Sequence, residues 1–319
     1  MDQEDRICLL TDKMTQIIGL MSKHLPDDIY DCLIRMRKEE DSQPAGAIYD
    51  CMLENMERAS SSGRPVCQDT GILQFHIRAG ARFPLLAELP GILNEAVRRA
   101  TIEVPLRPNV VETFTGKNTG TNIGTGAPCI EWTSISDSDD LTIELYMAGG
   151  GCSLPGKAMV LMPGRSMVLM PAAGFEGIRQ YVIDTVLDRG INACPPLLVG
   201  VGIGTCADRA AVLSKRALLR PVGSRNENSD AAAFEMELIR LLDALRIGPQ
   251  GLTGRRTVLD VHVEWEAHHP ATLAVGVSVG CWATRRACVH VDKELHCRLL
   301  SHLRCREQEQ KKACTCASE

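Results

Sequence analysis

The stretch that decides the fold class is CPPLLVGVGIGTCADRAAVLSKRAL, residues 194–218. Its apolar run at 197–203 predicts a buried strand, and the pattern at 207–218 predicts a helix directly after it. The same mixture extends along the chain and predicts an α/β or α+β fold, a single domain of mixed sheets surrounded by helices. Further strands are expected at residues 72–79, 129–135, 141–147, 257–265, 273–279 and 286–291, and further helices at 8–24, 27–40, 85–103, 175–188 and 230–245.

Three local features refine this expectation. Pro90 can mark the first turn of the helix predicted at 85–103, and the Ser- and Gly-rich residues 59–65 are expected to form a loop. The turn at 137–140 is expected to join the strands at 129–135 and 141–147 as a hairpin.

Composition excludes several classes of protein. The chain has 319 residues, of which 45% are apolar and 24% charged, as in an ordinary globular protein. A net charge of −5 and an aromatic content of 4% argue against a nucleic-acid binder. The apolar runs are too short and too interrupted by glycine for a membrane span. The acidic N-terminus differs from a signal peptide, so we expect a cytoplasmic protein.

Two glycine motifs offer alternative functions. GVGIG at 200–204 is similar to a dinucleotide-binding loop, but its spacing is incomplete and a tight strand-to-helix turn also explains it. GVSVG at 276–280 matches the nucleophile elbow of hydrolases and would make Ser278 a nucleophile. An elbow requires a helix after the serine, whereas another strand-like run follows here. A serine hydrolase using Ser278 is therefore a distant alternative.

The fourteen cysteines do not form a recognisable zinc or redox motif, because no Cys-x-x-Cys pair is present. Most are expected to be buried small apolar residues. Cys67, Cys194 and Cys281 differ, since each lies at a strand end or turn beside glycine or proline. Thiolates from distant segments can hold an iron–sulfur cluster. Their spacing alone equally fits a cysteine-rich scaffold without enzymatic activity.

Polar residues near these cysteines suggest an anionic substrate. Gln68 and Asp69 directly follow Cys67, and Arg285 follows Cys281 by four residues. Arg107 lies between two prolines that fix its backbone. A guanidinium group is well suited to bind a carboxylate, although a surface salt bridge is the common alternative for any single arginine.

Several motifs together resemble the class I, iron–sulfur fumarate hydratases over roughly residues 15–292. These motifs are PVCQDTG at 65–71, GGG at 149–151, NACPPLLVGVGIG at 192–204 and GPQGLTG at 248–254. Two further segments, AGGGCSLPG at 148–156 and LRPVGSR at 219–225, favour the tartrate-dehydrating branch of this family. A two-chain enzyme acting on fumarate and malate is the alternative within the family.

The resemblance implies a residue-by-residue assignment. Cys67, Cys194 and Cys281 would hold a 4Fe–4S cluster with one open iron, which acts as a Lewis acid in a hydro-lyase. The implied reaction converts L(+)-tartrate to oxaloacetate and water, with Asp69 as a candidate general acid. The substrate, a small hydroxy-dicarboxylate, would contact Gln68, Asp69, Arg107, Gly149 and Lys157.

The resemblance also implies a partner and a domain division. In this family a second domain supplies the general base, and we expect a separate beta subunit to carry it in an α2β2 assembly. Residues 1–292 would form the cluster-binding domain, as in the N-terminal domain of class I fumarases. Residues 293–319 are expected to be a charged, solvated tail containing Cys305, Cys314 and Cys316. A near-repeat at 157–172 is expected to lengthen one loop.

Overall fold

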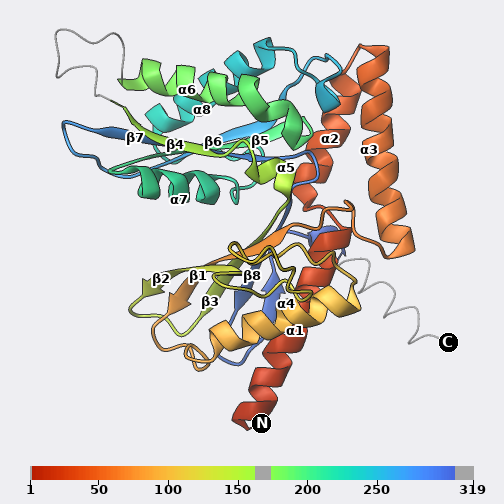
Figure 1. Ribbon diagram of the computed structural model, residues 1–319, viewed down its shortest axis with the longest axis vertical. Coiled ribbons are helices and arrows are strands. Elements are labelled where there is room, and N and C mark those ends of the chain that lie inside the picture. Colours follow the sequence, from red (N-terminus) through yellow and green to blue (C-terminus); the bar gives the residue numbers. More distant parts are fainter. Residues whose placement is uncertain (1, 162–173, 306–319) are drawn as a thin grey trace. The chain divides into compact units, whose positions relative to one another are not determined.

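The computed structural model describes residues 2–161 and 174–305. They divide into two compact units, each assembled from separate stretches of the chain. The first unit contains residues 2–27, 55–149 and 285–305, and the second contains residues 28–54, 150–161 and 174–284. Figure 1 shows each unit with its own sheet and helices. The mixed α/β class predicted from the sequence is confirmed.

The first unit is built on a five-stranded sheet in the order β2-β1-β3-β8-β9. Strand β1 pairs in parallel with β2 and antiparallel with β3, and β8 pairs antiparallel with both β3 and β9. Helices α1 and α4 pack against each other and cover the sheet. The bounds are α1 Gln3–Lys23, β1 Ile72–Gly80, α4 Leu89–Glu103, β2 Cys129–Ile135, β3 Leu141–Ala148, β8 Arg285–Val291 and β9 Cys297–Leu299.

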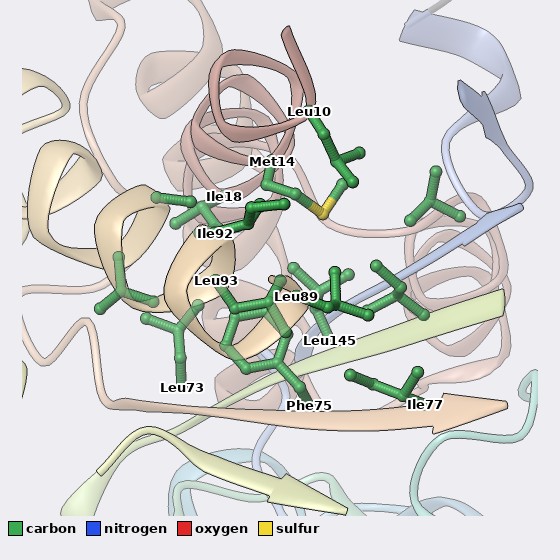
Figure 2. Close-up of a cluster of buried hydrophobic side chains, with 14 of the residues drawn as sticks. Leu10, Met14, Ile18, Leu73, Phe75, Ile77, Leu89, Ile92, Leu93 and Leu145 are labelled. Atoms are coloured by element: carbon green, nitrogen blue, oxygen red, sulfur yellow. The ribbon is translucent and has the colours of Figure 1, made fainter. Parts of the chain in front are cut away.

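An apolar core fills the space between the two helices and this sheet. Figure 2 shows Met14 and Ile18 of α1 near Ile92 and Leu93 of α4, with Phe75 of β1 below them. Burying such side chains removes apolar surface from water, which contributes about 25 cal/mol for each Å². The core therefore fixes the sheet beside which predicted site residues lie, since the Asp69 loop leads into β1 and Gly149 directly follows β3.

The second unit is built on a four-stranded sheet in the order β4-β7-β5-β6. Figure 1 shows α6 and α8 on one face of this sheet and α7 on the other. Helix α2 and the first part of α3 also belong to this unit. The bounds are α2 Asp27–Glu39, α3 Gln43–Ser62, α5 Gly150–Ser153, β4 Lys157–Leu161, α6 Gly174–Arg189, η1 Gly190–Ala193, β5 Leu197–Gly204, α7 Ala207–Ala217, α8 Ser229–Ala244, η2 Pro249–Gly251, β6 Val258–Trp265 and β7 Leu273–Gly280.

The glycines of the 200–204 motif lie inside strand β5 and face α7. A Cβ atom on Gly200 would lie 2.1 Å from the Ser214 carbonyl oxygen, and one on Gly202 would lie 2.1 Å from that of Ala210. Only glycine allows the helix to approach the strand this closely. The motif is thus a packing device within the strand, and neither a dinucleotide loop nor the strand-to-helix turn expected for it.

Each helix and strand predicted from the sequence is present, with differences at the ends. The predicted hairpin is wrong, because β1 lies between β2 and β3 and pairs with both. The loop expected at 59–65 is also partly wrong, because helix α3 continues to Ser62. Pro90 lies in the first turn of α4, as expected.

The C-terminal segment differs from the solvated tail that the sequence suggests. Cys297–Leu299 forms strand β9, and His302 is fully buried. Apolar contacts and backbone pairing therefore hold at least residues 297–302 in the first unit. Cys314 and Cys316 lie outside the described residues. Residues 162–172 of the near-repeat, which follow β4, also lie outside them. Among the described helices, none has the length and apolar content needed to cross a lipid bilayer.

Candidate active site

The loop between α3 and β1 carries three of the expected site residues. Cys67 and Asp69 are half-buried, and Gln68 is exposed. The Asp69 carboxylate is fixed, because its Oδ1 accepts hydrogen bonds from the Gly71 amide at 3.0 Å and from Asn109 Nδ2 at 3.1 Å. These two donors set the orientation of the side chain that the resemblance assigns as a general acid.

Arg107 is held beside this loop through its main chain. Its amide donates to Thr70 Oγ1 at 3.0 Å, and its carbonyl oxygen accepts from Asn122 Nδ2 at 3.1 Å. The residue itself is exposed. A fixed backbone with an exposed guanidinium is an arrangement that can bind a carboxylate arriving from solvent.

Gly149, directly after β3, leaves space for the Asp69 carboxylate. A Cβ atom at position 149 would lie 2.9 Å from Asp69 Oδ2, closer than side chains normally approach. Gly71 makes a second close approach, since its Cβ would lie 2.7 Å from the Ala148 carbonyl carbon and its φ is +78°. The first unit therefore brings the Asp69 loop and the Gly149 segment into direct contact.

Two further residues of this site, Asn109 and Arg285, have contacts that the sequence did not predict. Asn109 follows Arg107 by two positions, and its side-chain amide bridges Asp69 Oδ1 and the Gly71 carbonyl oxygen, at 3.1 and 3.2 Å. Arg285 begins β8 and donates from Nη2 to the Asp69 carbonyl oxygen at 2.8 Å. Its distance in sequence from Cys281 had pointed to Arg285, but not to this contact.

Cys194 and Cys281 lie at the same end of the sheet in the second unit. Strands β5 and β7 pair antiparallel with Leu198 opposite Gly280, so the residue after β7 returns to the start of β5. The Trp282 amide donates to the Cys194 carbonyl oxygen at 3.2 Å. Cys194 is exposed and adopts a left-handed backbone conformation with φ 54°, whereas Cys281 is buried.

The left-handed backbone conformation of Cys194 is uncommon for a residue with a side chain and carries strain. Cys67 belongs to the first unit, so the three cysteines of the expected set come from both units. All cysteines in the described ranges carry thiols and none of these forms a disulfide.

Lys157 begins strand β4 in the second unit. Its Nζ lies 2.6 Å from Asp188 Oδ2 on α6, in an ion pair whose side chains are both about one-third exposed or more. The hydrogen bond from Lys157 lowers the pKa of the Asp188 carboxyl below its ordinary value. The structure thus gives Lys157 an identified partner within its own unit.

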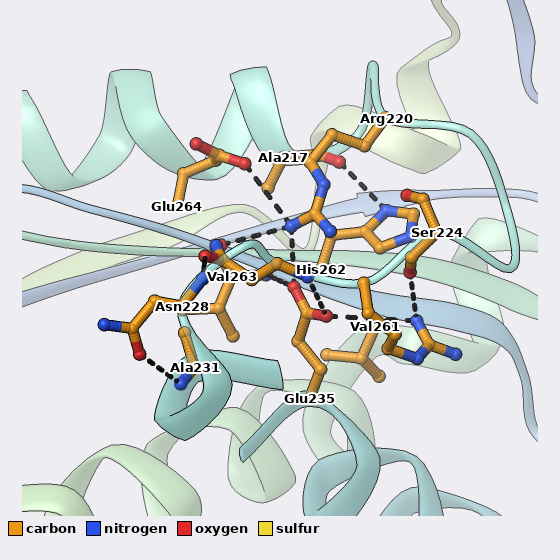
Figure 3. Close-up of polar contacts among 12 residues, drawn as sticks. Ala217, Arg220, Ser224, Asn228, Ala231, Glu235, Val261, His262, Val263 and Glu264 are labelled. Atoms are coloured by element: carbon orange, nitrogen blue, oxygen red, sulfur yellow. Dashed lines mark hydrogen bonds and ion pairs between the residues drawn. The ribbon is translucent and has the colours of Figure 1, made fainter. Parts of the chain in front are cut away.

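The LRPVGSR segment that favours the tartrate branch lies in a buried polar network. Figure 3 shows Arg220 directed at Glu235 and Glu264. Arg220 Nη1 lies 2.6 Å from Glu235 Oε1, and the Glu235 side chain is fully buried. The Asn226 and Val263 amides also donate to Glu235, at 3.1 and 2.9 Å. This segment therefore has a structural role in tying α8 to β6.

Asp260 extends the same network. Its Oδ2 accepts from the Gly223 amide at 2.6 Å, and its Oδ1 lies 2.9 Å from Arg225 Nη1. Burial opposes ionisation of Asp260, but hydrogen bonding and charge from His262, together with Gly223 and Arg225, lower its pKa below the ordinary value. The carboxylate is thus held in its charged form within the scaffold.

The hydrolase alternative is contradicted by the position of Ser278. This residue lies inside β7, is buried, and shares a hydrogen bond of 2.8 Å with Ser214 on α7. A nucleophile elbow would place the serine on an exposed turn between a strand and a helix. Ser278 instead joins the helix to the sheet.

Comparison with known proteins identifies the family. Residues 11–290 match the family described as Fumarate hydratase (Fumerase). The chain is 46% identical over 303 residues to the L(+)-tartrate dehydratase subunit alpha of Escherichia coli strain K12, covering 95% of this chain and 97% of the relative. It is 35% identical over 280 residues to a putative L(+)-tartrate dehydratase subunit alpha of Methanocaldococcus jannaschii, covering 87% and 96%. The chain therefore belongs to the fumarate hydratase (Fumerase) family.

Proposed function

We propose that this chain is the alpha subunit of an L(+)-tartrate dehydratase, a hydro-lyase that forms oxaloacetate and water. The observation that carries the proposal is the 46% identity to a subunit of that name over 95% of this chain and 97% of the relative. The arrangement around Asp69 supports it, because a fixed carboxylate lies beside a backbone-anchored arginine. Both are useful for a dicarboxylate that must lose a proton and a hydroxyl group.

We infer that Cys67, Cys194 and Cys281 would be the ligands of a 4Fe–4S cluster, because the chemistry of three thiols suits that group. Cys194 has an exposed side chain on a strained turn, and the Trp282 amide ties that turn to the segment of Cys281. Soft thiolate donors are the ligands that iron–sulfur clusters use. When bound through three thiolates, such a cluster supplies an iron with an open position, a Lewis acid for the departing hydroxyl.

The chain's own residues would bind and orient the substrate. Arg107 would pair with one carboxylate, and Gln68 and Lys157 would contribute further polar contacts. Asp69 would deliver a proton to the leaving hydroxyl group, giving water. Removal of the proton from the neighbouring carbon leaves an enol, which becomes oxaloacetate by moving its proton from oxygen to carbon. Gly149 would keep space open beside Asp69 Oδ2 for these groups.

The base that removes the carbon-bound proton would come from a beta subunit. The curated relatives are named subunit alpha, which supports a partner chain. We infer an α2β2 assembly, with the cluster-binding region spanning residues 1–292 of this chain. The cluster-loaded chain alone should then not turn over tartrate, and unaided turnover would contradict the division of roles.

The test is anaerobic reconstitution of the purified chain with iron and sulfide. About four irons per chain are expected, and they should be lost in Cys67→Ala, Cys194→Ala and Cys281→Ala. Cys51→Ala is the matched control, because this cysteine is exposed on α3 and should leave the iron content unchanged. A wild-type chain that binds no iron would overturn the cluster proposal.

The substrate is tested on the loaded chain combined with its beta subunit. Formation of oxaloacetate from L-tartrate is the expected result, together with loss of activity on prolonged exposure to air. Hydration of fumarate to malate without activity on tartrate would instead support the two-chain fumarase alternative. Matched assays with both substrates on one preparation distinguish the two.

A further inference from the structure

Arg285 interrupts an apolar row on strand β8. Alternate residues of a strand share one face of the sheet, and Ala287, Val289 and Val291 all belong to the core beneath α1 and α4. Arg285 occupies the same alternation and lies opposite Met147 of β3, another core residue. A charged group therefore stands where the pattern of the sheet predicts an apolar side chain.

The charge at Arg285 is buried and sparsely partnered. Only 2% of the residue is exposed. Nη2 donates to the Asp69 carbonyl oxygen at 2.8 Å, while Nε and Nη1 have no hydrogen-bond partner in the described part of the chain. Buried donors are normally satisfied, and a buried charge without a counter-charge is strongly unfavourable.

The surroundings of Arg285 lead directly to the candidate site. Met147, its neighbour across the strand pair, lies two residues before Gly149, which approaches Asp69 Oδ2. The hydrogen bond that Arg285 donates from Nη2 goes to the main chain of Asp69 itself. A group that filled the unmet donors would therefore lie next to the loop that carries Cys67, Gln68 and Asp69.

We propose that Arg285, which contacts the Asp69 loop through Nη2, is a positioning residue that offers Nε and Nη1 to an anionic acceptor bound in the working enzyme. This proposal rests on the proposed function, which supplies two sources of such an acceptor. One is a carboxylate of the substrate and the other is a sulfide of the cluster. Both are anionic hydrogen-bond acceptors that would satisfy a buried guanidinium.

The first experiment compares the stability of unloaded chains, for which activity is not needed. Arg285→Met replaces an unpaired buried charge with an apolar side chain of similar reach, so its melting temperature should equal or exceed that of the wild type. Arg220→Met is the control, because Arg220 has Glu235 as a counter-charge at 2.6 Å and its loss should lower the melting temperature. Equal destabilisation by both changes would show Arg285 to be only structural and would overturn the proposal.

The second experiment identifies the acceptor in chains loaded with iron and sulfide. Arg285→Met and the charge-conserving Arg285→Lys are compared with the wild type for iron content and, with the beta subunit present, for the KM of L-tartrate. Loss of iron in Arg285→Met, partly restored in Arg285→Lys, assigns the acceptor to the cluster. Normal iron content with a KM raised about tenfold or more assigns it to the substrate.

The outcomes separate this proposal from the one on which it rests. A wild-type chain without iron would count against the proposed function before Arg285 is considered. A wild-type chain that loads iron and uses tartrate, beside an Arg285→Met variant with unchanged iron content and KM, would overturn the role of Arg285 alone.

Discussion

Two arginines, a partly buried one in the second unit and a buried one in the first, differ in how their charge is satisfied. In the second unit, Arg220 lies 2.6 Å from the fully buried Glu235 and within reach of Glu264. In the first unit, Arg285 is more deeply buried, and among residues 2–161 and 174–305 its hydrogen-bond partner is the Asp69 carbonyl oxygen alone. Arg220 thus has two counter-charges and one buried donor, Nη2, without a hydrogen-bond partner, whereas Arg285 has no ion-pair partner among the described residues and two such donors, Nε and Nη1.

The difference separates a scaffold from a site. A buried charge with its counter-charge and hydrogen bonds holds neighbouring elements in one arrangement, and removing one partner is costly. A buried charge without such a partner destabilises the fold, so a bound group is expected to complete it. The Arg220 network thus stabilises the second unit, whereas the Arg285 region is adapted to bind.

The contrast between the two arginines is tested by removing the buried counter-charge of Arg220. Glu235→Gln keeps the size of the side chain but removes the buried counter-charge of Arg220. We expect the free energy of unfolding to fall by about 3 to 5 kcal/mol, the usual result when one partner of a buried ion pair is lost. Urea-induced unfolding at neutral pH measures this change.

The matched control lies on the same helix. Glu237→Gln removes a partly exposed carboxylate that pairs with Arg179 at 2.8 Å. Exposed or partly exposed pairs contribute about 1 kcal/mol or less, so the loss should be small. Equal losses for the two variants would mean that burial of Glu235 does not distinguish the network from surface pairs.

Local patterns were enough to predict most of the fold. Apolar periodicity predicted the strand at 197–203 and the helix after it, because a buried face requires apolar residues at regular spacing in the sequence. Pairing between strands requires no such local pattern. The hairpin expected from the turn at 137–140 is absent because β1, distant in sequence, lies between β2 and β3. Helix α3, Gln43–Ser62, was not predicted at all, and its serine-rich end has the composition of a loop.

The candidate site was predictable only as far as its residues stand in motifs. Asp69 and Gly149 lie in segments with a family resemblance, and their close approach agrees with a shared site. Asn109 and Arg285 act through contacts between segments far apart in the chain, and composition does not reveal such contacts. The role of LRPVGSR in a buried network was likewise visible only after folding. The ligand set and the roles in catalysis stay predictions.

The first unit also buries a titratable group, the imidazole of His302, which folding keeps neutral. The stability of the protein should therefore depend on pH. His302 bonds through Nε2 with the His24 carbonyl oxygen at 3.2 Å, and burial lowers its pKa to about 4. An unfolded histidine titrates near pH 6.5. Between pH 6.5 and 4 the unfolded chain therefore binds more protons, so acidification should reduce stability by roughly 3 kcal/mol.

His302→Gln tests this assignment by removing the titrating group. Denaturant midpoints at pH 7.5 and 4.5 should differ less for this variant than for the wild type, although its stability at pH 7.5 is lower. His296→Gln is the control, since His296 is exposed near the same strand and should leave the pH slope almost unchanged. A slope that persists in His302→Gln would assign the acid sensitivity to other groups.

The smallest loss of stability is expected for Gly149→Ala, which fills the space beside the Asp69 carboxylate. Gly149→Ala would place a methyl group 2.9 Å from Asp69 Oδ2, so the carboxylate must move. We expect a stability loss of about 1 kcal/mol, typical of mild overpacking. The turnover of tartrate by the loaded chain with its beta subunit should fall about tenfold or more, because small misplacements of a catalytic group are costly.

Gly91→Ala is the control that makes this loss of turnover informative. A Cβ atom at position 91, on the exposed side of α4, would meet no heavy atom within 4 Å. Alanine should therefore raise stability by about 0.5 to 1 kcal/mol through helix propensity and leave turnover unchanged. If Gly149→Ala kept full turnover, the Asp69 carboxylate would not need the orientation seen here. The contrast between a region adapted to bind and a stabilising scaffold would then rest on Arg285 alone.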